Sequence, residues 1–320
     1  MVAVLVILDG ASEPGGATAT SLERARTPAL DELAAAGTLS RVRTVPAGLP
    51  AGSETAIPVL LGWTPAVPVD RGMIEAAARD VPLAEGQRAW RVDVVAADGG
   101  RAEETSVGRA ADELRAAAPR HSVQPIGEHR LLLTGPPPLP IAAREGLRVW
   151  AEGALPPRLL GPATVVVAAR GAAAGVARLM GADVVVPDGA TGSLDTDLEA
   201  KAASALEAMA RGAKQVVVHV GAPDEASHRR NPAAKVAAIE RIDRELVTPL
   251  ARAVMRAGGT LRVCPDHGCD PRTGIHDGDP VPCLTWSAGA GGNGGRMRLT
   301  ERAVAELPAT VPTSTCVEVW

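Results

Sequence analysis

The sequence lacks phenylalanine and tyrosine altogether, and its five tryptophans are its whole aromatic complement. Modules that bind single-stranded RNA or DNA stack bases on exposed aromatic side chains, so this composition disfavours that function. A basic excess is missing as well, since the formal net charge is −4. A protein that grips a phosphate backbone needs a clearly basic face. We therefore expect no nucleic-acid partner.

Cysteine is scarce, and the four residues contain no C-x-x-C pair. Such a pattern is neither a disulfide framework nor a zinc ribbon, and free thiols are typical of a reducing compartment. The apolar segment 2–8 is short and has no basic region before it, unlike a signal peptide. The longest apolar region, 164–186, carries two arginines and an aspartate that a bilayer would disfavour. We expect a cytoplasmic protein with no membrane partner.

What the sequence does contain is an alternation of short β-branched runs and amphipathic segments, typical of an α/β protein. Hydrophobic residues make up 46% and charged residues 22% of the 320 positions, as in an ordinary globular chain. The pattern predicts strands at 2–8, 41–45, 165–168, 184–186, 215–220, 260–264 and 281–286, and helices at 28–36, 172–180, 198–211 and 233–257. This order predicts an α/β sandwich with a mostly parallel central sheet.

The middle of the chain differs from the rest in composition and in the length of its predicted strands. Prolines cluster between 136 and 157, and the strand candidates at 92–96 and 130–133 are short. We expect residues 66–160 to form a smaller α+β cap domain that binds substrate. This domain is inserted into a discontinuous core made of residues 1–65 and 161–320.

Chemically active side chains follow three of the predicted strands. Asp9 comes directly after the first strand, Asp224 comes shortly after 215–220, and Asp266 follows 260–264. In an open α/β sheet, ligands gather outside the carboxyl ends of the strands. Asp224 and His228 are spaced i, i+4, so a helical turn places both on one side. We therefore expect these side chains to converge on one site.

The full candidate set supplies seven oxygen or nitrogen donors, enough for two divalent cations that share one pocket. Its members are Asp9, Ser53, Asp224, His228, Asp266, His267 and His276. Mixed imidazole and carboxylate ligands favour Zn²⁺ or Mn²⁺ over Mg²⁺ or Ca²⁺. Taken singly, each member has an ordinary explanation as a turn former, a surface residue, a helix cap or a loop histidine. The joint order of all seven indicates a site.

Two further signals carry less weight. Residues 289–294 fit G-x-G-x-x-G but lack the following βαβ unit and its acidic residue, so a loop is the better interpretation. Cys264 and Cys269 flank Asp266 and His267, which makes a thiolate ligand conceivable, but their spacing matches no common zinc motif. We expect both thiols to be structural.

Several motifs together resemble the cofactor-independent phosphoglycerate mutases of archaeal type, which belong to the alkaline phosphatase superfamily. The motifs are VILDG at 6–10, AGSETA at 51–56, LLGWTP at 60–65, VHVGAPDEASH at 218–228, PDH at 265–267, His276 and GDPVP at 278–282. The resemblance covers about residues 1–65 and 163–290. It implies an alkaline-phosphatase-like sandwich and a phosphoryl-transfer reaction.

The resemblance also implies roles for the seven residues. Ser53 is implied as the nucleophile that becomes phosphoserine. One cation is implied to bind Asp9, Ser53, Asp266 and His267, and the other Asp224, His228 and His276. A serine hydroxyl is a weak nucleophile that a bound cation activates, and a second cation neutralises charge on the phosphoryl oxygens.

The inserted domain departs from the family, in which it is usually longer. Its segments around Arg71, Arg91, Arg109 and Arg130 resemble fragments of the family's cap, so these arginines are candidates for binding a carboxylate or phosphate. A shortened cap leaves three functions open. They are mutase-like transfer on a small phosphorylated or phosphonate metabolite, a phosphomonoesterase with the same nucleophile, and a non-catalytic metal- or metabolite-binding descendant. The sequence does not predict an oligomeric state.

Overall fold

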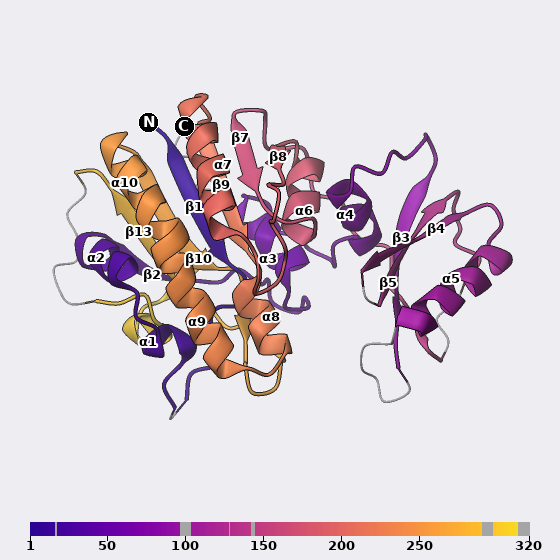
Figure 1. The fold of residues 1–320 in the computed structure, drawn as a ribbon, viewed down its shortest axis with the longest axis horizontal. Coiled ribbons are helices and arrows are strands. Elements are labelled where there is room, and N and C mark those ends of the chain that lie inside the picture. The colour runs from indigo at the N-terminus through magenta and orange to yellow at the C-terminus, as the bar shows by residue number, and fades with distance from the viewer. Residues whose placement is uncertain (17, 97–103, 128, 142–144, 290–296, 313–320) are drawn as a thin grey trace. The chain divides into compact units, whose positions relative to one another are not determined.

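The computed structural model describes residues 1–16, 18–96, 104–127, 129–141, 145–289 and 297–312 (Figure 1). The chain folds as two compact units. The core unit comprises residues 1–66 and 156–320, and the inserted unit comprises residues 67–155. Most of the G-x-G-x-x-G segment, from residue 290 on, lies outside the described residues. None of the helices in the described part of the chain has the length and apolar character needed to cross a bilayer.

The core unit is built on an eight-stranded sheet, which confirms the predicted α/β class. In spatial order its strands are β14 (Ala309–Thr310), β2 (Thr38–Val42), β13 (Val281–Ser287), β10 (Thr260–Pro265), β1 (Ala3–Leu8), β9 (Gln215–Val220), β7 (Thr164–Val167) and β8 (Asp183–Val185). β13 runs antiparallel to its neighbours β10 and β2, whereas the other paired strands run parallel. The mostly parallel sheet is therefore confirmed.

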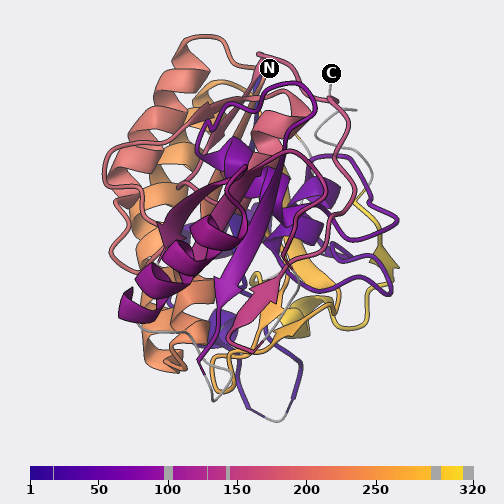
Figure 2. The ribbon, with the colours of Figure 1, turned by 90° about the vertical axis from the view of Figure 1, so that its right-hand side faces the viewer.

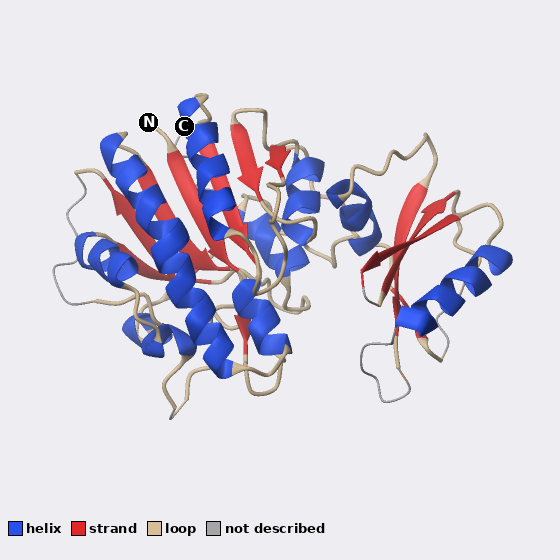
Figure 3. Ribbon diagram, in the orientation of Figure 1, coloured by secondary structure: helices blue, strands red, loops and turns tan. Residues whose placement is uncertain are grey.

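Helices cover the sheet as in a sandwich (Figure 3). They are α1 (Ser21–Arg24), α2 (Pro28–Ala36), α3 (Ser53–Leu60), α6 (Ala172–Met180), α7 (Leu198–Ala210), α8 (Ala222–His228), α9 (Pro232–Ile242), α10 (Thr248–Arg256) and α11 (Glu301–Val304). Alternate side chains of β1, at Val4, Val6 and Leu8, pack in one cluster with α2, α7, α9 and α10. The intervening Leu5 and Ile7 point to the opposite face and are also buried. Both faces of the central strand are thus in the core, which explains its continuous apolar sequence.

The helix predicted at 233–257 contains a single π-helical turn, η1 (Asp243–Val247), between α9 and α10. Pro249 has no backbone N–H, so the α-helical hydrogen bond to the carbonyl of residue 245 is lost. Thr248 instead donates both its backbone N–H and its hydroxyl to the carbonyl of Asp243. The Asp243 carboxylate accepts hydrogen bonds from the backbone N–H groups of Ala29 and Leu30, which fixes the start of α2. Through Asp243, the π-helical turn is thus hydrogen-bonded to the start of α2, which packs in the same hydrophobic cluster.

The strand predicted at 41–45 lies earlier in the chain, because β2 spans Thr38–Val42. It begins directly after Gly37, where α2 ends, and Leu39 pairs with Leu284 of β13. Leu39 and Val42 are the buried side chains of the strand, so this register is the one that fills the core.

The inserted unit has an antiparallel sheet in the order β4-β5-β3-β6. Its elements are α4 (Arg71–Ala78), β3 (Arg88–Val94), α5 (Glu104–Ala117), β4 (Ser122–Gly127), β5 (Arg130–Gly135) and β6 (Leu147–Val149). Figure 2 shows α5 lying across this sheet. Trp90, Val92, Leu114, Leu131 and Leu133 form a hydrophobic core of its own. The two short strands predicted from sequence correspond to β3 and β5.

Truncating a central core side chain tests this architecture. Ile7 is fully buried in β1, so Ile7→Ala leaves a cavity and is expected to lower the free energy of unfolding by about 2–5 kcal/mol. Ile275→Ala is the matched control, because Ile275 is 67% exposed and should change stability by less than about 0.5 kcal/mol. Urea unfolding of both variants measures the difference. Equal midpoints for the two variants would contradict the placement of β1 at the centre of the core.

Candidate metal centre

The adjacent strands β1, β9 and β10 run parallel, so their carboxyl ends lie at the same edge of the sheet. Asp9 follows β1, Asp266 and His267 follow β10, and α8, after β9, carries Asp224 and His228. The turn at Gly10 has a φ of +58°, and a Cβ atom there would lie 2.5 Å from Asp224 Oδ1. Glycine is required because the chain passes this close to the cluster. The expected convergence of these residues is observed in the structure.

Ser53 is the first residue of α3, and its hydroxyl donates to Asp9 Oδ1 at 3.0 Å. Gly52 is the N-cap residue of the helix and makes no side-chain capping bond. The Ser53 side chain therefore points at the carboxylate rather than capping its own helix. Its position at a helix N-terminus also favours negative charge on an incoming group.

The imidazoles of His267 and His276 are oriented in the same way. His267 Nδ1 lies 3.0 Å from the carbonyl of Gly268, and His276 Nδ1 lies 3.1 Å from the carbonyl of Ala51. A proton on each Nδ1 satisfies these carbonyls and leaves the Nε2 lone pairs facing the cluster. This arrangement, with one ring nitrogen fixed by a backbone acceptor, is typical of histidines that bind metals.

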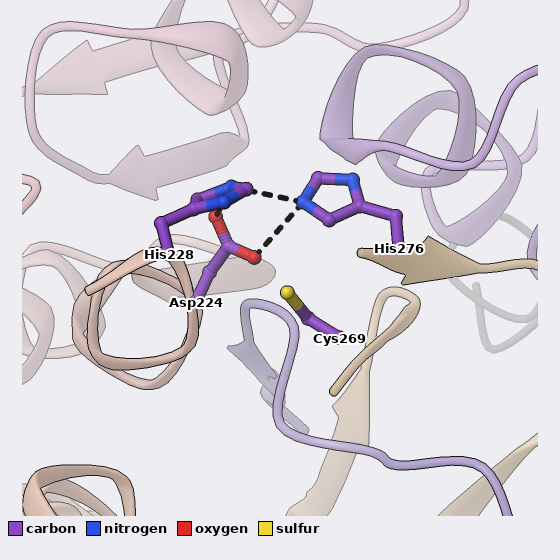
Figure 4. Close-up of side chains that lie close together, drawn as sticks. All are labelled: Asp224, His228, Cys269 and His276. Carbon is purple, nitrogen blue, oxygen red and sulfur yellow. Dashed lines mark hydrogen bonds and ion pairs between the residues drawn. The ribbon is translucent and has the colours of Figure 1, made fainter. Parts of the chain in front are cut away.

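Figure 4 shows the group formed by Asp224, His228, Cys269 and His276. His228 Nε2 lies 3.1 Å from Asp224 Oδ2, and His276 Nε2 lies 3.2 Å from Asp224 Oδ1. The two Nε2 atoms are 3.0 Å apart. Nitrogen atoms at this distance need either a shared proton or a cation between them, because two lone pairs or two N–H groups would repel. His276 belongs to the short strand β12 (His276–Asp277) and not to a solvated loop.

A second group lies around Asp9. His267 Nε2 is 3.3 Å from Asp9 Oδ1, and His219 Nε2 is 3.3 Å from Asp9 Oδ2. Asp266 Oδ1 accepts from the backbone N–H groups of Gly10 and His267, which leaves Oδ2 for a ligand. Three sets of ligand atoms, each within 4.8 Å of one another, arise from these contacts. They are Asp224, His228, Cys269 and His276; Asp9, Asp224 and His267; and Asp9, His219 and Asp266.

The titration of these groups reflects their crowding. Burial and the charge of Asp224 oppose ionisation of Asp9, but the close contacts with the imidazoles of His219 and His267, each 3.3 Å from an Asp9 oxygen, prevail and lower its pKa to about 2. Burial and the charge of Asp9 raise the pKa of Asp266 to about 6. Burial opposes a charge on His267, yet Asp266 and Asp9 raise the pKa of this imidazole well above its usual value. Without a cation, protons on the imidazoles therefore compensate the buried carboxylates.

Several buried polar atoms in this region have an ion-pair neighbour but make no hydrogen bond of normal geometry among the described residues. They are His219 Nε2, Asp224 Oδ1, Asp266 Oδ2 and His267 Nε2. Unsatisfied buried polar atoms are costly, and here all four lie in the same cluster. Carboxylate oxygens and imidazole nitrogens that converge in this way fit divalent cations such as Zn²⁺.

Sequence reasoning did not identify His219 or assign Cys269 to the site. His219 interrupts the valine run of β9 and is 8% exposed. A polar residue within a strand of apolar residues could have indicated a functional side chain. Lys201 of α7 is buried beneath it and donates to the His219 carbonyl at 2.8 Å. Burial lowers the pKa of Lys201 to about 8, although Asp9 opposes that shift.

The four candidate arginines all lie in the inserted unit and differ in their surroundings. Arg91 is buried and pairs with Asp93 and Glu75. The Arg71 guanidinium lies 3.8 Å from the ring centroid of Trp150. Arg109 is exposed on α5, and Arg130 is half-buried at the start of β5. Their role in substrate binding stays a prediction.

Comparisons with known proteins agree with this chemistry. The chain is 28% identical to a 2,3-bisphosphoglycerate-independent phosphoglycerate mutase of Methanosarcina acetivorans, over 89% of each chain. It is 29% identical to a probable enzyme of the same name from Geobacter sulfurreducens, over 91% of this chain and 92% of the relative.

Among solved structures, the PH0037 protein of Pyrococcus horikoshii matches with a TM-score of 0.80 and 24% identity, over 99% of this chain and 96% of that one. A cofactor-independent phosphoglycerate mutase from Thermoplasma acidophilum matches with a TM-score of 0.64 and 20% identity, over 99% of both chains. These two similarities concern the fold. The sequence relatives confirm the resemblance to phosphoglycerate mutases that the motifs indicated. A family profile described as the metalloenzyme superfamily matches residues 1–311, and the chain therefore belongs to that superfamily.

Proposed function

We propose that the chain transfers a phosphoryl group through a phosphoserine at Ser53, on a small phosphorylated metabolite. The observation that carries this proposal is the hydrogen bond from Ser53 Oγ to Asp9 Oδ1, made beside two groups of metal-type ligands. A hydroxyl in that position is held by a carboxylate and lies at a helix N-terminus. Both features suit a nucleophile that acquires a phosphate.

The candidate residues have different roles in this proposal. Asp224, His228 and His276 would hold one cation, and Asp9, Ser53, Asp266 and His267 the other. When bound, the cations favour the serine alkoxide and screen the charge of the phosphoryl oxygens. Asp9 orients Ser53 Oγ for an in-line attack, in which the bond from Oγ to phosphorus forms and the bond to the leaving oxygen breaks. The serine proton ends on that leaving oxygen.

The fate of the phosphoserine defines the activity. Transfer to a second hydroxyl of the substrate gives a mutase, whereas transfer to water gives a phosphatase. The names of the aligned relatives favour mutase-like transfer and a phosphorylated carboxylic acid as substrate. Arg71, Arg91, Arg109 and Arg130 supply guanidinium groups suited to its carboxylate or phosphate.

Removing the hydroxyl of Ser53 tests the nucleophile. Ser53→Ala is expected to lower phosphoryl transfer from 3-phosphoglycerate at least about 10³-fold, because the attacking atom is lost. Phosphorus NMR of the reaction, with Zn²⁺ or Mn²⁺ present, distinguishes isomerised product from free phosphate.

Ser287→Ala is the control, since Ser287 pairs with Thr260 at the opposite end of β10 from Asp266. An active Ser53→Ala variant would exclude the phosphoserine. Free phosphate as the wild-type product would identify a phosphomonoesterase.

Metal content tests the two ligand groups. His228→Ala and His276→Ala each remove a ligand that belongs to one group only, so the bound metal is expected to fall from about two ions per chain to about one. Elemental analysis of zinc-loaded protein measures it. Asp112→Ala, which removes an exposed carboxylate of α5, should leave the content unchanged. Two ions retained in both ligand variants would refute the assignment.

The pH dependence of metal affinity follows from the histidines. Burial opposes a charge on His276, but Asp224 raises its pKa, and Asp266 and Asp9 do the same for His267. Because their pKa values are raised, these imidazoles stay protonated up to a higher pH than a free imidazole. In the protonated form, their ion pairs with the aspartates stabilise the metal-free fold. That stabilisation is lost as the pH rises through the raised pKa values.

A cation must displace these protons, so the apparent affinity for Zn²⁺ should fall as the pH decreases. We expect a loss of up to about tenfold per pH unit for each proton displaced. Competition with a chromophoric chelator between about pH 6 and pH 8 measures this slope. An affinity that is constant over the range would show that these imidazoles are not ligands.

A further inference from the structure

We propose that the thiolate of Cys269 is a fourth ligand of the cation held by Asp224, His228 and His276, so that this group is a zinc-selective site. The inference rests on the metal-dependent function proposed above and adds to it a soft ligand. Sequence reasoning treated Cys269 as a structural thiol. The structure places its sulfur among the ligand atoms of the group, all within 4.8 Å of one another.

The space between these atoms has the dimensions of a metal site. Zn²⁺ binds sulfur at about 2.3 Å and imidazole nitrogen at about 2.0–2.1 Å, usually in a tetrahedron. In Figure 4 the Cys269 sulfur points toward Asp224 and His276. Cys269 is also fully buried, with an exposed fraction of 0%. The sulfur therefore faces the cluster and not the solvent.

The backbone around Cys269 holds the side chain in this orientation. β11 (Gly268–Cys269) pairs antiparallel with β12, and Cys269 is directly opposite His276. Side chains of directly opposed residues leave the ribbon on the same face, with Cβ atoms about 4.5–5.5 Å apart. The register alone thus sets the thiol beside the imidazole.

Buried polar groups fix this short ribbon in the core unit. The N–H of Cys269 donates to the carbonyl of Ser12 at 2.9 Å. The Cys269 carbonyl accepts from Lys235 Nζ at 2.7 Å and from Ser227 Oγ at 3.3 Å. Lys235 is itself completely buried. A ligand needs this kind of support to be preorganised.

The chemistry of the four ligands selects the metal. Two imidazoles and a carboxylate accept Mn²⁺ as well as Zn²⁺, whereas a thiolate favours Zn²⁺ strongly. As the zinc–sulfur bond forms, the S–H bond breaks and its proton passes to solvent, with no change in oxidation state. One thiolate and one carboxylate then balance the two positive charges of the ion. Balanced charge favours binding at a site that is partly removed from solvent.

Four protein ligands also complete the tetrahedron of this ion. Structural zinc sites are closed in this way, whereas catalytic sites keep an open position. The sets of ligand atoms that contain Asp9 include no thiol.

Cobalt substitution tests the thiolate directly. The protein is stripped with a chelator and titrated with Co²⁺, whose bond to a thiolate gives an intense charge-transfer absorption in the near ultraviolet. We expect this band in the wild type and in Cys264→Ser, and its loss in Cys269→Ser. The weaker visible bands of Co²⁺ bound to the remaining ligands should persist in Cys269→Ser. Its Zn²⁺ affinity should fall at least about tenfold, and its preference for Zn²⁺ over Mn²⁺ should decrease.

A variant in which Cys269 is the sole thiol, with serine at positions 264, 283 and 316, is expected to keep the band. This variant decides the question even where Cys269→Ser fails to fold. A wild-type protein without the band, or a Cys269→Ser variant that retains it, would overturn the proposal.

The cobalt experiment tests the Cys269 ligand independently of the proposed phosphoryl transfer. The band with no phosphoryl transfer from any phosphate ester refutes the function and keeps the ligand. Transfer without the band refutes the ligand and keeps the function.

Discussion

The site in the core unit depends on positive charge that offsets the repulsion between three carboxylates, two of them buried and one half-buried. Asp9, Asp224 and Asp266 converge because parallel strands end at one edge of the sheet. Their negative charges are stable there only beside positive charge, and imidazolium groups or cations supply it. The raised pKa values of His267 and His276 express this need in the metal-free protein. The same need is the physical reason for proposing a metal centre at this edge.

Much of this arrangement follows from local sequence signals. Continuous β-branched runs identify buried parallel strands, and the residues after them must meet at the carboxyl edge, which is why Asp9, Asp224 and Asp266 were predictable. His219 and Cys269 were missed for a tertiary reason. The first side chain reaches Asp9 because β9 lies beside β1, and the second reaches His276 through the register of a two-residue ribbon. Neither pairing is encoded in residue spacing.

The two units carry different parts of the account. The core unit contains the proposed nucleophile and every proposed metal ligand, and the superfamily profile, which matches residues 1–311, spans both units. The inserted unit contains the four candidate arginines, some of which already have protein partners such as Asp93 and Trp150. The proposed phosphoryl transfer therefore involves residues of the core unit, whereas the proposed substrate contacts come from the inserted unit.

The central claim is that cations bind where the carboxylates and imidazoles converge. Anomalous X-ray scattering at the zinc edge, from crystals of the zinc-loaded protein, tests it most directly. The account predicts one peak among Asp224, His228 and His276 and another beside Asp9, Ser53 and Asp266. Zinc peaks confined to other parts of the molecule, with neither group occupied, would contradict it.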